Sequence, residues 1–411
     1  MSGEPAAQPA GAPTPPTPPD DPQSFVERLA GRYSIGGVLT PIITTIIAFL
    51  AGGIVIAATG HNPASAYRAI FNGTGLNWFF PWVLGADRAN AASNLQQTLI
   101  LTTPLILCGL AVAFAFRCGM FNIGGQGQYL VGSYVAIFVG SSWVHMAGAA
   151  HVFLAVTLAA LAGAAWAGIA GFLKATTGAH EVISTIMLNW IAIWVGTYFF
   201  GLSGPFQGPD AFNPISNNVV DGAKLPVFWG DPQLQGLHVG IFIALGALVV
   251  FWLILNRTTT GYEVKAVGFN PSAAEYGGIS VKKNYFLAMA ISGFFAGLAG
   301  AMDILGWEFN ISTPQILLSN IGFIGIAVAL LGRNTAVGTM FAALLFGALY
   351  VGTSTRQLDP SVFDPELASN LTLIIQGLVV LFVGADLLVI ATWDKTRSAV
   401  GGRGRKAAPY Q

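Results

Sequence analysis

Three side-chain amides lie close together at the start of an apolar run: Asn122, Gln126 and Gln128. Four glycines between residues 119 and 127 surround them. A helix that begins this way inside a membrane has free backbone groups, which need polar partners or a water-filled path because lipid offers none. The stretch therefore predicts either part of a transport path or a set of amides that cap helices and hold them together.

A second polar stretch lies in the loop over residues 256–283. Asn270 is a natural N-cap, and Pro271 suits the first position of a helix. Residues 272–276 then favour a short helix, which the glycines at 277 and 278 would end. A short capped helix outside the membrane would give a soluble partner a surface to bind, whereas a plain connecting loop would not need these signals.

Other chemistry finds little support in the chain. The dipeptide Gly-Lys occurs nowhere, so there is no P-loop for ATP phosphates. His180 and Glu181 begin like a zinc-protease helix, but Ser184 stands where the second histidine is required. The five histidines are scattered, the two cysteines cannot form a Cys-rich metal site, and no Ser/His/Asp arrangement is evident. We therefore expect neither an enzyme nor a metal site.

The composition indicates a membrane protein. Hydrophobic residues make up 54% of the 411 residues and charged residues only 9%, against about 25% charged in an average soluble protein. This excludes a soluble enzyme and a secreted disulfide scaffold. The chain has 18 basic residues (Lys and Arg) and 18 acidic residues (Asp and Glu), so it has no net positive charge to attract nucleic acid. The 51 glycines suit helices that approach closely in lipid.

These polar stretches must be positioned by transmembrane helices, because apolar runs long enough to cross a bilayer recur from Val38 onward. The sequence predicts an all-α, polytopic bundle of about ten helices within a transmembrane domain over 37–393. A Pro-rich, disordered tail precedes it over 1–36, and a basic tail follows over 394–411. The expected helices cover 38–58, 99–116, 122–140, 151–173, 182–200, 239–255, 284–306, 316–332, 335–353 and 371–392.

The distribution of cations predicts the orientation. With ten crossings and the N-terminus inside, only Arg68, Arg88, Lys224 and Arg356 lie outside, and the other fourteen of the 18 cations lie inside. Because Lys and Arg favour the cytoplasmic side, both termini are expected there. Two acids, Asp303 and Asp386, fall within spans, each near enough to a helix end to reach water. Without an intramembrane base they form a poor proton relay, which disfavours a secondary carrier.

An internal similarity suggests a duplication. Residues 109–117 and 325–333 share five of nine residues, and each segment ends an inward-running helix with an Arg. Transporters are often built from such repeats, with the substrate path at the repeat interface, although apolar helices also match by chance.

Three segments together resemble a known family. They are 121–128 (FNIGGQGQ), 181–190 (EVISTIMLNW) and the loop with Asn270, Pro271 and Gly278. They are similar to permease subunits of bacterial ABC importers of the ribose/galactose and branched-chain amino acid group. The nucleoside branch, which works with basic-membrane-protein-type lipoproteins, is the most similar. Gln126 departs from the Glu of many relatives, and His180 from an Asn.

The resemblance implies partners and site residues. It implies no bound cofactor, because a separate subunit binds ATP, together with a second permease and an extracytoplasmic solute-binding lipoprotein. For the ATPase contact it implies Asn270, Pro271, Ala273, Ala274, Glu275, Tyr276 and Gly278. For the solute path it implies Asn122, Gln126, Gln128 and Asn189, with Trp190 as an aromatic wall. A nucleoside would suit such a path, and a sugar or branched-chain amino acid remains the alternative, as does a secondary carrier of a different class.

Overall fold

The chain forms a bundle of helices in a computed structural model, which describes residues 36–141, 146, 148–231 and 236–353, with isolated residues between 370 and 381. Two short strands in a loop are its only strands among these residues. The elements are α2 (Gly36–Ala58), α3 (Pro63–Gly73), η1 (Leu76–Phe79), α4 (Gly85–Arg117), α5 (Gly125–Gly140), α6 (Gly148–Thr177), α7 (Glu181–Phe200), η2 (Asp221–Ala223), β1 (Val227–Trp229), β2 (Leu237–His238), α8 (Gly240–Arg257), α9 (Thr259–Phe269), α10 (Pro271–Tyr276), α11 (Val281–Asp303), the π-helical turn η4 (Ile304–Glu308), α12 (Thr313–Leu318), α13 (Ile321–Leu331) and α14 (Ala336–Gly352).

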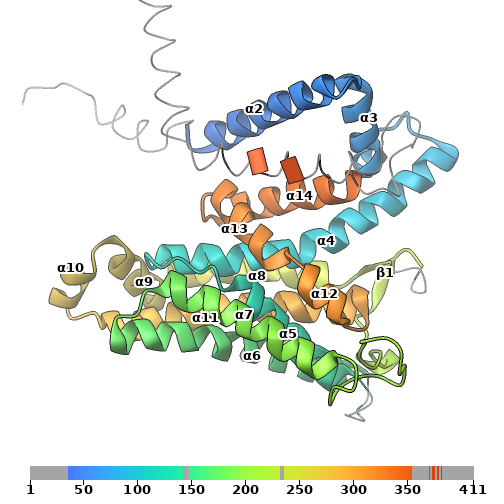
Figure 1. Cartoon of the computed structure of the whole chain (residues 1–411). Coiled ribbons are helices and arrows are strands. Elements are labelled where there is room, and N and C mark those ends of the chain that lie inside the picture. The colour runs from blue at the N-terminus through green and yellow to red at the C-terminus, as the bar shows by residue number, and fades with distance from the viewer. Residues whose placement is uncertain are drawn as a thin grey trace, which may run out of the picture.

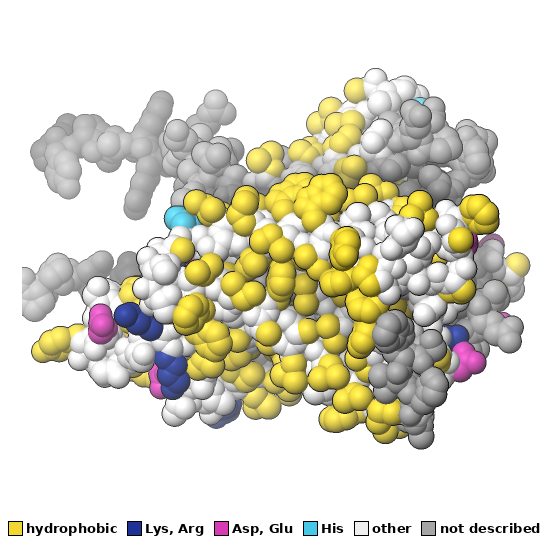
Figure 2. All heavy atoms as spheres, turned by 60° about the horizontal axis from the view of Figure 1, so that its bottom comes forward, with side chains coloured by type: hydrophobic (Ala, Val, Ile, Leu, Met, Phe, Trp, Pro, Cys, Tyr) yellow, Lys and Arg dark blue, Asp and Glu magenta, His cyan; other side chains and the backbone are white. Residues whose placement is uncertain are grey.

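The expected all-α membrane bundle is confirmed. Among the described residues, six helical segments are long and apolar enough to cross a membrane, and two shorter apolar helices accompany them. Figure 2 shows a broad apolar face between two ends that carry the charged side chains. Most of the last expected span, 371–392, lies outside the described residues, as do Asp386, residues 1–35 and the tail over 394–411.

Helix α4 lies at the centre of the bundle. Nearly every side chain in its second half, from Thr102 to Ala115, is buried. It packs against α8, α11, α13 and α14, with α9 and α10 at one end of the bundle and β1 at the other (Figure 1). The two similar segments lie side by side here, because a Cβ on Gly109 would meet Val328 and one on Gly325 would meet Cys108.

Glycines allow α11 and α6 to touch through their backbones. A Cβ on Gly297 would lie 2.4 Å from the carbonyl oxygen of Ala159, and one on Gly163 would lie 2.4 Å from that of Gly293. Such contacts leave no room for a side chain, and in lipid they supply the close packing that holds helices together. The high glycine content therefore has a specific use in this seam.

The two ends of the bundle are distinguished by their contacts. At one end, the loop after α7 contacts the π-helical turn that follows α11: the amide of Leu225 donates to the carbonyl of Leu305, and that of Val219 donates to the carbonyl of Phe309. This loop also contains the antiparallel pair β1–β2, which the sequence did not predict. At the other end, Arg117 donates two hydrogen bonds to the carbonyl of Asn334, so the two similar segments end at one face.

Several helices differ from the expected spans. Helix α4 begins at Gly85 rather than residue 99, and the loop over 256–283 contains an unexpected helix, α9. The expected span over 316–332 is broken at Ser319 and Asn320, between α12 and α13. Hydropathy could not reveal the break, because side chains distant in the sequence satisfy its backbone groups.

Candidate functional site

The amides at the start of α5 bind one another and the neighbouring helices. Gln128 and Asn122 exchange two hydrogen bonds of 2.9 and 3.0 Å, and Asn122 also donates to Ser292 on α11 (2.7 Å). The oxygen of Asn122 accepts from the amide of Gly124, one residue before α5 begins. These side chains are fully buried, so they compensate the free backbone of the helix start inside the bundle.

Gln126 bridges the break between α12 and α13. Its Nε2 donates to the carbonyl of Ser319 (2.9 Å), and its Oε1 accepts from the amide of Gly322 (2.9 Å). One amide thus satisfies a carbonyl at the end of one helix and an amide at the start of the next. A neutral glutamine can do both, because it carries a donor and an acceptor, whereas an ionised glutamate only accepts.

The two expected path residues on α7 face opposite directions. Asn189 is buried against α5, where it accepts from the amide of Gly127 (2.7 Å) and donates to the carbonyl of Ile123 (2.9 Å). Trp190 is exposed and belongs to an aromatic stripe with Trp194 and Tyr198, four residues apart. The structure therefore brings the four amides together and places Trp190 on a different surface.

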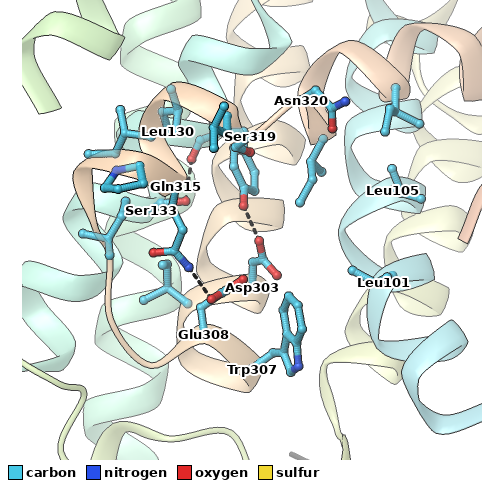
Figure 3. Close-up of a pocket in the computed structure, with 18 of the residues that line it drawn as sticks. Leu101, Leu105, Leu130, Ser133, Asp303, Trp307, Glu308, Gln315, Ser319 and Asn320 are labelled. Atoms are coloured by element: carbon cyan, nitrogen blue, oxygen red, sulfur yellow. Dashed lines mark hydrogen bonds between the residues drawn. The ribbon is translucent and has the colours of Figure 1, made fainter. Parts of the chain in front are cut away.

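A cavity of about 320 Å³ lies beside this amide cluster (Figure 3). Its walls come from α4, α5, the π-helical turn and the broken α12–α13 segment, and Ser319 is shared with the contacts of Gln126. Most of its surface is apolar, with leucines such as Leu101 and Leu105 on the α4 side. It is large enough for a small molecule, since ligand pockets start at about 300 Å³.

Two carboxyl groups project into the cavity, as Figure 3 shows. The Tyr129 hydroxyl donates to Oδ2 of Asp303, and Nε2 of Gln315 donates to Oε2 of Glu308. Asp303 is only 3% exposed, which differs from the expectation that it could reach water. The reason is that Asp303 faces the interior of the bundle, where the Tyr129 hydroxyl and the other walls of the cavity surround its carboxyl group.

Sequence reasoning missed three of these residues: Tyr129, Glu308 and Gln315. Glu308 follows the expected helix end at 306, and Gln315 precedes the next expected span at 316. A signal was present at Gln315, because Ser312 and Gln315 fit a capping box, which the structure contains. Nothing in the sequence indicates the π-helical turn, a feature found often at functional sites.

The short helix predicted in the loop over 256–283 is confirmed as α10. The side chain of Asn270 accepts from the amide of Ala273 (3.0 Å), Pro271 takes the first position, and Gly278 has φ +82°. Six of the seven expected contact residues are exposed, with Tyr276 at 98%. Ala274 differs, because it is buried beneath the helix and holds α10 in place.

The loop is fixed to α11 on its inner side. Glu263 of α9 accepts from Nδ2 of Asn284 (3.1 Å) near the start of α11, and Lys283 lies 3.9 Å from the same carboxylate. Helices α6 and α7 are joined at the same end of the bundle, where Lys174 and Glu181 form an ion pair of 2.8 Å. A force on α9 and α10 would therefore reach α11, whose other end forms the cavity.

Comparisons with known proteins place this architecture in a family. Residues 94–384 match the family model described as the branched-chain amino acid transport system, permease component. The chain is 39% identical to the guanosine ABC transporter permease protein NupP of Bacillus subtilis, over 86% of this chain and 94% of the relative. It is 34% identical to the nucleoside ABC transporter permease protein NupB of Lactococcus lactis, over 90% and 98%.

Two further relatives bear on the solute and the partners. The glucose ABC transporter permease protein TsgB13 of Haloferax volcanii is 33% identical over 84% of this chain and 86% of the relative. A second guanosine permease protein of Bacillus subtilis, NupQ, is 29% identical over 62% of this chain and 79% of its own. No solved structure matches the chain. By the family model and its identity to NupP and NupB, the chain belongs to the family of branched-chain amino acid transport system permease components.

Proposed function

We propose that the chain is the permease subunit of an ATP-driven importer that moves nucleosides across the membrane. The observation that carries this is its identity of 39% and 34%, over most of its length, to permeases named for guanosine and nucleosides. The family is a transport component rather than an enzyme. The chain is accordingly a multi-pass protein of the bacterial plasma membrane.

The solute path, in this proposal, involves Asn122, Gln126, Gln128, Asn189 and Trp190. The four amides hold the broken helices that shape the path, which is supported by their bonds to the starts of α5 and α13. Trp190 contributes an aromatic wall with Trp194 and Tyr198, and aromatic faces stack well on flat bases. Irregular backbone at membrane depth is typical of segments that line a cavity.

The proposed topology has ten spans and both termini in the cytoplasm. It is supported by the threading of the described helices, since the loop after α7 and the end of α11 meet at one face. Arg117, Asn334 and the α9–α10 loop lie at the opposite face. The proposed domains are a transmembrane unit over 37–393 between tails over 1–36 and 394–411.

A separate ATP-binding subunit would bind α10 and supply the energy for transport. Asn270, Pro271, Ala273, Glu275, Tyr276 and Gly278 form its exposed surface, and Ala274 supports it from beneath. The neighbouring Phe269 is 96% exposed, so the large rings of Phe269 and Tyr276 are both exposed, one at each end of the short helix. Exposed aromatic side chains at the polar end of a membrane protein suit a protein partner.

The names of two relatives support a second permease as a partner. NupP and NupQ are both named as guanosine permeases of one organism, which supports a second permease beside this chain. We propose that the pair is a heterodimer and that a solute-binding lipoprotein delivers the nucleoside at the face opposite α10.

The test of the solute is competition during uptake. Cells that express this chain with its partner subunits should take up radiolabelled guanosine, and unlabelled nucleosides should compete while glucose and leucine do not. Because TsgB13 is named for glucose, the specific alternative is a sugar importer. Competition by glucose alone would favour that alternative and contradict the nucleoside assignment.

A further inference from the structure

The cavity in Figure 3 contains hydrogen-bond acceptors without a cation to match them. Asp303 and Glu308 both line it, and neither belongs to an ion pair among the residues that the structure describes. A charge removed from water is costly unless it is paired or hydrogen-bonded. Two carboxyl groups inside a membrane bundle therefore need a functional reason.

Each carboxyl group is held in place and keeps a free acceptor. The hydrogen bond from Tyr129 occupies one oxygen of Asp303, and the bond from Gln315 occupies one oxygen of Glu308. Gln315 is itself fixed, because its Oε1 accepts from the amide of Ser312 (2.9 Å). The second oxygen of each acid remains available to donors on a ligand.

Another polar atom in the wall is independent of the acids. The hydroxyl oxygen of Ser319 is buried and has no hydrogen-bond partner among the described residues. It stands at the break between α12 and α13, where it lines the cavity next to Asn320. A buried hydroxyl without a partner is costly, and a ligand that reaches it would remove that cost.

Aromatic groups complete the wall. Trp307 lies on the same π-helical turn as Glu308, and the half-exposed Tyr350 of α14 also lines the cavity. A site with paired acceptors at one part and aromatic rings at another matches a molecule with vicinal hydroxyls and a flat ring. Carboxylates commonly accept from ribose hydroxyls in nucleotide sites.

We propose that this cavity binds the ribose of a nucleoside, with Asp303 and Glu308 accepting hydrogen bonds from its vicinal 2′- and 3′-hydroxyls. This inference rests on the proposed function and adds a recognition site within a single permease. It lies apart from the exposed aromatic stripe of α7, which carries Trp190. The site would select ribonucleosides over sugar-modified analogues.

The experiment compares two probes, guanosine and 2′,3′-dideoxyguanosine, in proteoliposomes that contain the complete transporter. Wild-type protein should prefer guanosine. Asp303→Asn and Glu308→Gln keep the size of each side chain but replace one acceptor oxygen with an NH2 donor. Each should lower guanosine uptake by about tenfold, the effect of losing a hydrogen bond to a charged group. Uptake of the dideoxy probe should change little. The ratio of guanosine uptake to dideoxyguanosine uptake should therefore fall towards one.

The matched control is Asp221→Asn, an acid on an exposed loop that pairs with Lys224 (2.7 Å). It should leave both probes unchanged. An equal loss for both probes, a shift only in pH or sodium dependence, or an unchanged preference in both cavity variants would overturn the ribose site. Absence of guanosine uptake by the wild-type transporter would instead count against the proposed function.

Discussion

Gln126 illustrates how one residue can determine the shape of a membrane bundle. It is a buried glutamine whose two polar atoms bind the two sides of a helix break. Its sequence context predicted a broken helix entry, and α5 does begin only at Gly125. What the sequence could not show is that its partners are Ser319 and Gly322, nearly two hundred residues away.

Replacing Gln126 should therefore destabilise the bundle, and the loss of stability should grow with the number of its hydrogen bonds that are removed. Gln126→Leu leaves two backbone groups unpaired, at about 1–3 kcal/mol for each. Gln126→Glu retains the acceptor for Gly322 and should be intermediate. Thermal unfolding of the purified permease in detergent measures both. Equal stability of Gln126→Leu and the wild type would contradict the bridging role.

The residues of the cavity show where sequence reasoning ends. Asp303 was identified because an acid within an apolar span is rare, but its surroundings depend on tertiary contacts. Tyr129 reaches it from α5, and the π-helical turn brings Glu308 to the same space. Neither the pairing nor the turn has a pattern in hydropathy.

At the scale of elements, the seam between α6 and α11 has the clearest physical requirement. Gly297 touches Ala159 and Gly163 through the backbone, so the two helices are closer than side chains would allow. By contrast, a methyl group on Gly246 in α8 would meet no described atom within 4 Å beyond its own turn of the helix, so this glycine provides a matched control.

Gly297→Ala should destabilise the permease, because a methyl group would overpack the seam by about 1–3 kcal/mol. Gly246→Ala should be neutral or slightly stabilising, since alanine favours a helix by up to about 1 kcal/mol. The measurement is the unfolding midpoint of each variant in the same detergent. If Gly297→Ala unfolds at the same temperature as Gly246→Ala or at a higher one, the close packing of α6 and α11 does not determine the stability of the permease.

The short helix α10 was predictable because its signals are local. An N-cap, a proline and two glycines lie within nine residues and need no partner elsewhere. The preceding helix α9 was missed, because its eleven residues lie in a polar loop and have no long apolar pattern.

Tyr276→Ala should weaken binding of the ATP-binding subunit while the permease inserts normally, because the ring is 98% exposed and supports no packing among the described residues. Phe212→Ala is the control, since Phe212 is 91% exposed in the loop after α7, at the other face. Co-purification of the ATPase, normalised to permease abundance, is the readout. Equal recovery with both variants would exclude α10 as the main contact.

At the scale of the whole molecule, α11 connects the proposed coupling loop to the cavity. Its start is bound to α9 through Asn284 and Glu263, and its end forms the cavity wall. Movement of the loop helices would therefore displace Asp303 and Glu308. The predicted topology places the coupling loop on the cytoplasmic side and the loop after α7 on the outer side, which labelling can test.

Single cysteines should label from opposite sides. Phe212→Cys should react with an impermeant maleimide from outside, and Ser272→Cys only from inside. Both native cysteines are buried, and burial raises the pKa of Cys118 to about 12, so its thiol stays protonated and unreactive at about pH 8. Labelling of Ser272→Cys from outside would contradict the proposed topology.

The most direct test of the account is reconstitution of transport. Proteoliposomes that contain this chain, the second permease and the ATP-binding subunit should accumulate guanosine delivered by the binding protein, only when ATP is present. Omission of the ATP-binding subunit should abolish accumulation. Accumulation by this chain alone, without ATP, would contradict the assignment as an ABC permease and identify a secondary carrier.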